Sequence, residues 1–196
     1  GNATTLSGDN IPTAPVTCES YVGKLFLASG NTLRWGGYMG AWQDFHPDNN
    51  QTFNSAVKGL KVYGDSTNSF MLVLCDRHVA IAQFAPETVQ TGGLGQFVFD
   101  QISAQHGCAA PASVEECYIP GLGFSILWAD YDGIKIYNPS IGVQKVTDKI
   151  RPDWEALNLS NISKFVGKFY RTKGWYVLSC STTAATTLDQ QIIVDL

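Results

Sequence analysis

Three short segments of the chain combine side chains that could bind a metal or act on a substrate. In the first, Asp44, His46 and Asp48 alternate, so in an extended segment they would share one side, as zinc ligands do. Pro47 makes this segment a turn, however, and Asp and His are ordinary turn residues. The pattern favours a solvated loop over a metal site.

The second segment, Cys75-Asp76-Arg77-His78, brings together a nucleophile, an acid and a base. Catalysis by a thiol needs the base within hydrogen-bond reach of the sulfur. Neighbouring residues of a strand point to opposite faces, so nothing in the spacing brings Cys75 and His78 together. We therefore expect no catalytic residue here.

The third segment offers His106 and Cys108, with Cys117 further along, as metal ligands that lack a fourth member. Two glycine-rich stretches, residues 92–95 and 121–123, are not followed by the Lys-Ser/Thr pair of a phosphate-binding loop. We therefore expect no metal site and no cofactor, and we do not expect an enzyme.

Tryptophans could provide a platform for sugar rings. Trp128 and Trp175 lie in the middle of strand-like segments, which favours packing in the core. Trp35 and Trp42 flank a glycine-rich stretch that would let another backbone approach closely, so core and interface both remain open for them.

Composition narrows the class of protein. The 196 residues are 44% hydrophobic and only 15% charged, and the net charge is −4. Average chains carry about 25% charged residues, so the surface is weakly charged. The 13 Lys and Arg residues are scattered, which excludes a basic arm for nucleic acid. No stretch approaches the ~18 apolar residues of a membrane span.

The five cysteines do not form a disulfide framework by number, because five is odd. Cys75 and Cys180 lie in apolar strands and should be reduced and buried. Cys108 and Cys117 flank a loop, where they either pair or remain free in a reducing compartment. Four glycosylation sequons, at Asn2, Asn50, Asn158 and Asn161, point instead to secretion.

Short segments rich in Val, Ile, Phe, Tyr, Trp and Leu recur along the chain, separated by turn residues, which is typical of a two-sheet β protein. Residues 1–19 read as an extended arm and residues 51–56 as one helical turn. Residues 152–157 read as a short helix. Residues 68–76 have no polar face and predict a central strand buried on both sides. The other predicted strands are residues 20–28, 57–64, 79–84, 96–102, 124–129, 134–137, 164–171, 174–181 and 190–194.

This succession of an arm, eight or more antiparallel strands and an early one-turn helix resembles the single jelly roll of picorna-like virus capsid proteins. Residues 53–64 resemble the capsid segment in which a short helix leads into the next strand, and residues 186–194 are similar to a terminal capsid strand. The size, and a chain that begins at Gly1 without Met, resemble the small coat proteins of plant secoviruses such as cheraviruses. Cleavage of a precursor or of a tag would equally produce Gly1.

The resemblance implies an all-β, antiparallel two-sheet sandwich of the jelly-roll type over residues 20–196, with the arm over residues 1–19 and one or two short helices. It further implies a structural coat protein that assembles in the host cytoplasm with other capsid proteins into an icosahedral virion. Weak contact with packaged RNA and recognition by a host receptor or vector would follow from that role. Two other classes stay open: a secreted or surface carbohydrate-binding β-sandwich, and a metal- or thiol-dependent enzyme.

Overall fold

Antiparallel strands make up most of the protein. The computed structural model describes residues 11–37, 45–64, 69–85, 96–183 and 185–196. Strands account for 58% and helices for 9%, and the expectation of an all-β protein with little helix is confirmed.

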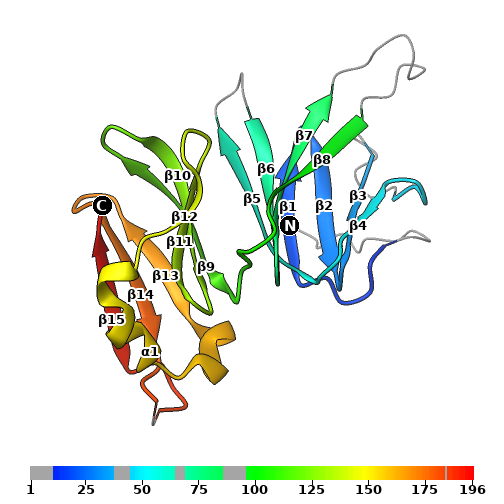
Figure 1. Ribbon diagram of the computed structural model, residues 1–196. Coiled ribbons are helices and arrows are strands. Elements are labelled where there is room, and N and C mark those ends of the chain that lie inside the picture. Colours follow the sequence, from blue (N-terminus) through cyan, green and yellow to red (C-terminus); the bar gives the residue numbers. More distant parts are fainter. Residues whose placement is uncertain (1–10, 38–44, 65–68, 86–95, 184) are drawn as a thin grey trace, which may run out of the picture.

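The described strands form four sheets, and in each sheet every strand pairs with the next one along the chain (Figure 1). The first sheet holds β1 (Thr17–Tyr21), β2 (Lys24–Ser29), β3 (Thr32–Trp35) and β4 (Asn50–Thr52). The second holds β5 (Val57–Gly64), β6 (Ser69–Cys75), β7 (Val79–Ala85) and β8 (Gln96–Ser103). The third holds β9 (Ala110–Ile119), β10 (Gly123–Asp130), β11 (Gly133–Asn138) and β12 (Gly142–Lys145). The fourth holds β13 (Val166–Tyr170), β14 (Trp175–Cys180) and β15 (Gln190–Asp195).

The two-sheet jelly roll is not confirmed. A jelly roll is built from two Greek keys, in which strands far apart in sequence become neighbours. Here the pairing is strictly sequential, and the described strands divide among four sheets rather than two.

The second sheet is buried on both faces. Met71 and Val73 of β6 belong to the apolar cluster shared with the first sheet, whereas Phe70, Leu72 and Leu74 belong to the cluster shared with the third. Side chains of a strand alternate between faces, so one continuous apolar run serves two cores. The central strand predicted at residues 68–76 is confirmed in β6, over Ser69–Cys75.

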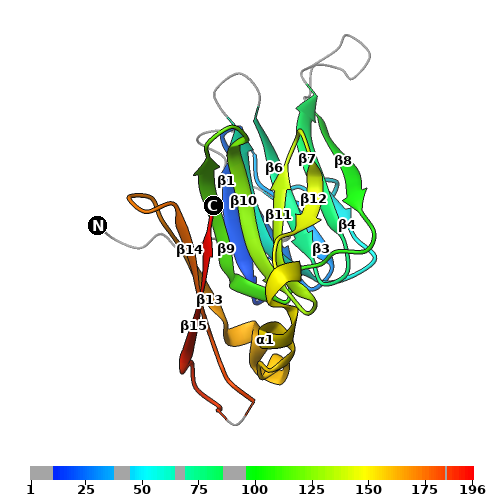
Figure 2. The same cartoon turned by 60° about the vertical axis from the view of Figure 1, so that its left-hand side comes forward.

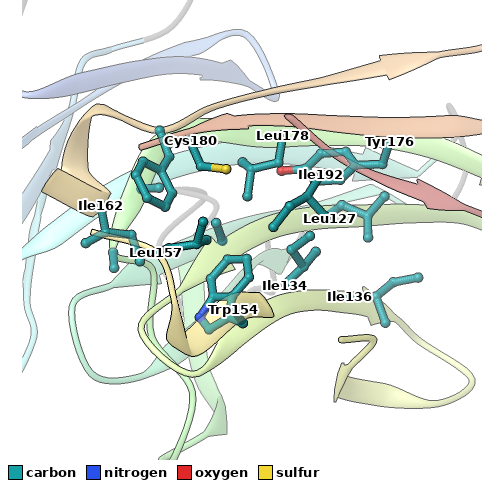
Figure 3. Packing of buried hydrophobic residues seen from close by; sticks show 14 of the residues in the cluster. Leu127, Ile134, Ile136, Trp154, Leu157, Ile162, Tyr176, Leu178, Cys180 and Ile192 are labelled. Carbon is teal, nitrogen blue, oxygen red and sulfur yellow. The ribbon is translucent and has the colours of Figure 1, made fainter. Parts of the chain in front are cut away.

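The third sheet is buried in the same way. Ile126 and Trp128 of β10 face the second sheet, and Leu127 faces the fourth. Figure 3 shows Leu127 near Tyr176 and Ile192 of the fourth sheet. Three cores in series therefore hold four sheets together.

The sheets converge at their first strands: β1 lies against β5, β5 against β9, and β9 against β13. Figures 1 and 2 show the sheets spreading from that line, with the first and fourth sheets at the two ends of the series. Consecutive four-stranded blades of a β-propeller are arranged in this manner. Each end of the series has one sheet face with no further sheet upon it among the described residues.

Tight turns set the register of the hairpins. The strand predicted at residues 20–28 is in fact two, because Val22 and Gly23 adopt φ values of 49° and 68° and reverse the chain between β1 and β2. Two residues with positive φ form the type I′ turn that suits a right-handed strand twist. The hairpin of β10 and β11 is confirmed, with Asp130 paired to Gly133. So is the hairpin of β13 and β14.

The other boundaries differ in places from those expected. The helical turn predicted at residues 51–56 is wrong, because β4 pairs there with β3. Part of the expected arm belongs to the first sheet: β1 begins at Thr17, and Val16 N–H donates to Ala28 O. The loop expected between Cys108 and Cys117 is instead largely strand, since β9 begins at Ala110.

The helical segments lie between the third and fourth sheets in sequence. They are η2 (Asp148–Ile150), α1 (Arg151–Glu155) and η3 (Leu159–Lys164), so the short helix predicted at residues 152–157 is confirmed in α1. Pro152 suits the first turn of α1, because its missing N–H has no partner there in any helix. Trp154 and Ile162 close the end of the core between these sheets (Figure 3).

Candidate functional site

The first candidate segment forms an exposed turn. His46 Nδ1 lies 3.5 Å from Asp48 Oδ2, and both side chains are mostly exposed. Asp44 lies outside the described residues. No group of three or more potential ligands for a metal occurs in the part of the chain that the structure describes.

The second candidate pair is buried. Cys75 lies at the end of β6 in the core shared with the first sheet, and burial raises the pKa of its thiol to about 12. His78 is also buried, which lowers its pKa, and its Nδ1 lies 3.0 Å from Ser55 Oγ. A neutral thiol in an apolar core is a poor nucleophile.

The third candidate set does not come together. Cys108 belongs to the core between the second and third sheets, whereas Cys117 belongs to the core between the third and fourth. Both thiols are free, so a disulfide between them is excluded. Cys18 is exposed, while Cys75 and Cys180 are reduced and buried as predicted.

Residues 106–108 instead connect the second and third sheets. Trp128 Nε1 donates to Gly107 O over 2.7 Å, and Gly107 N–H donates to Asp130 Oδ2 over 3.0 Å. A side chain at position 107 would meet Asp76 O at 2.0 Å, so only glycine fits. The segment has a structural role.

The glycines at 121 and 123 have φ values of 82° and 87°; Gly121 lies in the turn between β9 and β10, and Gly123 is the first residue of β10. Open space surrounds the position of a side chain at both. They serve the turn, as loop glycines usually do. The other stretch, residues 92–95, lies outside the described residues.

Two of the four tryptophans considered from the sequence are buried. Trp35 and Trp128 lie in cores, as does Trp154. Trp42 lies outside the described residues. Trp175, expected in the core, is only half-buried, because its neighbour Tyr176 points into the core and the alternation of β14 turns Trp175 outward.

The outward face of the fourth sheet carries an apolar patch. Val166 is 44% exposed, Tyr170 51% and Ile193 52%, and Trp175 and Val177 are half-buried between them. Tyr170 pairs with Trp175, and Val177 pairs with Ile193, so these side chains are cross-strand neighbours. We call these five residues the open face. The alternation of residues 166–170 and 175–177 could have revealed it from the sequence.

Among the described strands, the fourth sheet also has a free edge at β15, which pairs there with β14 alone. Leu196 N–H donates to Gly174 O, and this hydrogen bond shows which residues of β15 direct their backbone groups toward β14. In an antiparallel pair, alternate residues bond inward and outward. The backbone groups of Gln191, Ile193 and Asp195 therefore point away from β14.

A groove of about 450 Å³ runs along this edge. The fourth sheet contributes Ile193, Val194 and Asp195 to it, and the segment that follows β11 supplies the opposite wall. That wall consists of Lys145, Val146, Asp148, Lys149 and Ile150. Lys145 Nζ lies 3.1 Å from Asp148 Oδ1, so this pair is already neutralised. We call this space the edge groove.

A second recess, of about 560 Å³, opens where the ends of the first three sheets meet. Its lining includes the rings of Tyr21, Tyr63, Phe70 and Phe84 together with Gln83. Tyr63 stacks on Phe70 with ring centres 4.7 Å apart. The hydroxyl groups of both tyrosines are occupied, because Tyr21 donates to Ser69 O and Tyr63 donates to Phe124 O.

The sequon asparagines differ in the hydrogen bonds that their side-chain amides make. Asn158 and Asn161 both donate their side-chain N–H groups to Ala185 O, over 2.9 and 3.3 Å. Asn50 is exposed in β4, but its amide donates to Pro47 O. Asn2 lies outside the described residues.

These features place the chain in the class of all-β proteins made of antiparallel sheets. Comparison with known protein families finds no match, and no curated protein matches the chain. Within the described residues, no helix has the length and apolar character needed to cross a membrane.

Proposed function

We propose that this protein is a structural component of a multi-subunit particle, and that it acts through the open face and edge of its fourth sheet. The coat of a virus, expected from the resemblance to capsid proteins, is the particle to test first. In that role its partners are other coat proteins, and the particle is assembled in the host cytoplasm. The structural role rests on the surface of the fourth sheet, and the viral assignment rests on the sequence.

The observation that carries the proposal is the open face. Monomeric proteins rarely leave a contiguous apolar patch exposed, and larger patches mark interaction sites. Here Val166, Tyr170 and Ile193 are each about half exposed on one side of one sheet. The second and third sheets bury the corresponding faces against a neighbouring sheet, so the fourth sheet offers a surface of the kind that this protein buries elsewhere.

Residue chemistry on this face suits a protein partner. Aromatic residues are enriched in the buried centres of interfaces, where charged residues are depleted. Tyr170 and Trp175 supply two aromatic side chains, and Lys173 lies 5.9 Å from the centre of the Trp175 ring. Lys168 and Asp195 are the charged residues on the outward side of the described strands of this sheet, and Lys168 pairs with Glu115 of the third sheet.

The experiment is to express the chain together with candidate coat proteins and to examine the products by sedimentation and electron microscopy. Tyr170→Glu should prevent or weaken incorporation into particles, because it places a charge in the open face. Tyr131→Glu is the matched control, since Tyr131 is 55% exposed in the turn between β10 and β11. Equal incorporation of both variants would refute a role for the open face, and monomeric intact protein with every partner would refute the structural role.

The recess beside Tyr63 supports a second candidate, a carbohydrate-binding protein, because aromatic rings line it. On that hypothesis the intact chain is retained on a glycan column. Phe84→Ala should abolish retention, whereas Tyr118→Ala should not, because the exposed Tyr118 lies outside the recess. Absence of retention for the intact chain would exclude this candidate for the glycans tested.

A further inference from the structure

The free edge of the fourth sheet has features that favour pairing with another strand. Each of the other three sheets has a fourth strand beyond its third. Among the described strands, the fourth sheet has no strand beyond its third, β15. Natural sheet edges are commonly protected by Lys, Pro, shortness or bulges. β15 has six residues, Gln190–Asp195, without Lys or Pro, and its central Ile193 is half exposed.

The other edges are better protected. β4 has three residues, and β12 has four and ends in Lys145. β8 is longer, but Asp100 is an exposed charge within it, and a register irregularity interrupts its pairing with β7. β15 is thus the least protected of the outer edges in the described part of the chain.

We propose that two copies of this chain pair through β15, antiparallel and centred on Ile193, to form one six-stranded sheet. The proposal rests on the structural role proposed above, and it specifies the first contact that the protein makes in that role. Gln191, Ile193 and Asp195 direct their backbone groups outward, so two copies would exchange backbone hydrogen bonds at these residues. Such strand addition is a common mode of protein recognition.

The edge groove provides room beside β15. Paired strands lie about 4.8 Å apart, so an added strand would enter the space bordered by Ile193, Val194 and Asp195. Val146 and Ile150 give its opposite wall an apolar part. Side chains from the inward face of the added strand would meet these two residues.

The sequence of β15 is complementary to itself in this register. On the outward face, Ile193 meets Ile193 of the second copy, and Gln191 meets Asp195 of the second copy. On the inward face, Ile192 meets Val194. Apolar residues oppose apolar ones, and an amide opposes a carboxylate with which it can hydrogen-bond.

The neighbouring registers are worse. A shift that centres the pair on Ile192 brings Asp189 opposite Asp195 and Gln191 opposite Ile193. A shift that centres it on Val194 brings Ile193 opposite Asp195 twice. Like charges and apolar–charged pairs directly opposite each other are unfavourable, so the alignment on Ile193 is selected.

The first test measures self-association of the isolated full chain by sedimentation velocity over a range of concentrations. Gln191→Lys should tighten the dimer, because Lys would face Asp195 of the other copy, and Gln191→Asp should weaken it. Two such pairs form per dimer, so each change should shift Kd about twofold to thirtyfold. Equal Kd values for the two variants, or a monomeric wild-type chain at all concentrations, would overturn the proposal.

Ile193→Pro tests the backbone contact. The N–H of Ile193 points outward, so proline removes an intermolecular donor and leaves the β14–β15 ladder intact. We expect a folded monomer, with Ile193→Val as the dimeric control. If the proline variant does not fold, Ile193→Lys places two like charges opposite each other and should also be monomeric. A Lys variant that dimerises like wild type would overturn the proposal.

Cross-linking tests the register directly. In a Cys18→Ser background, which removes the exposed thiol, Ile193→Cys should form a disulfide-linked dimer on mild oxidation. The two Cα atoms of such a pair lie about 5.5 Å apart, within the range of a disulfide. Val166→Cys, exposed on the same face but in β13, should not cross-link. Equal cross-linking of both would refute the register.

The outcomes separate the two proposals. A chain that dimerises through β15 but enters no particle would support this inference and refute the proposed function. Particles that form equally well with Ile193→Pro, which places no charge in the open face, would support the function and refute pairing through β15.

Discussion

Two buried serines of this protein should respond oppositely to the same substitution. Ser113 lies in β9, where the pairing with β10 is irregular. Its hydroxyl donates to Ala110 O over 2.6 Å and accepts from Ala129 N–H over 2.7 Å. Ser181 Oγ is equally buried and has no hydrogen-bond partner among the described residues.

Ser113→Ala leaves two buried backbone groups without these partners. A buried polar group that loses its partner costs about 1–3 kcal/mol, so for two groups the free energy of unfolding should fall by about 2–6 kcal/mol. For a domain of this size, each kcal/mol lowers Tm by about 2–4 °C. Ser181→Ala removes a hydroxyl that is buried without compensation, so its effect should be neutral or stabilising.

Urea unfolding of the two variants, followed by circular dichroism, gives both free energies. Because the two substitutions remove the same atom from fully buried sites, cavity effects largely cancel in the difference. Equal destabilisation of the two variants would refute the reasoning, since it would mean that the hydrogen bonds of Ser113 contribute nothing measurable.

Three further predictions concern buried groups. A thiol reagent at pH 8 should label only Cys18 in the native protein and all five cysteines after unfolding. Burial raises the pKa of Cys117 to about 12 and that of Cys180 to about 11. The stabilisation that these thiols give below the ordinary pKa of 9 should therefore be lost progressively above pH 9, which unfolding measured over a pH series tests. Burial raises the pKa of Asp130 despite the hydrogen bond from Gly107, so Asp130→Asn should stabilise the protein at pH 7. The gain should shrink as pH falls through the raised pKa of Asp130 and reach its minimum below the ordinary carboxyl pKa of 3.8. Gly107→Ala should lower Tm sharply in a thermal melt, because its Cβ would lie 2.0 Å from Asp76 O, whereas Gly121→Ala meets no atom within 4 Å and should lose only the cost of its positive φ.

The sequence predicts those strands whose own residues, without a distant partner, carry the apolar pattern or turn signal of a strand. Residues 70–75 are apolar throughout, which is diagnostic of burial on both faces, and the Asp132-Gly133 pair marks a hairpin. Residues 51–56 were assigned wrongly because β4 is only three residues long and owes its form to pairing with β3. Local propensity has little weight where a distant strand supplies the hydrogen bonds.

The order of the sheets could not be predicted in this way. Alternation shows that Phe70 and Met71 point to opposite sides, but it does not show which sheet lies on either side. A strand buried on both faces is expected in any three-layered arrangement, and a two-sheet sandwich has no place for it. The continuous apolar run of β6 was therefore the strongest sign in the sequence against two sheets, although its meaning depends on the neighbours that the structure supplies.

The same reasoning explains why the candidate surface was missed. Residues that do chemistry attract attention by type, and the candidates selected by type, such as Cys75 and His78, are buried for packing. The open face consists of Val, Tyr, Trp and Ile, which by type belong to a core. Its distinction is positional: Val177 and Leu178 are adjacent and both apolar, but only Leu178 has a sheet opposite it. In a protein whose sheets pack in series, each inner face stabilises the fold, and the open face, at one end of the series, is the one that we propose a partner covers.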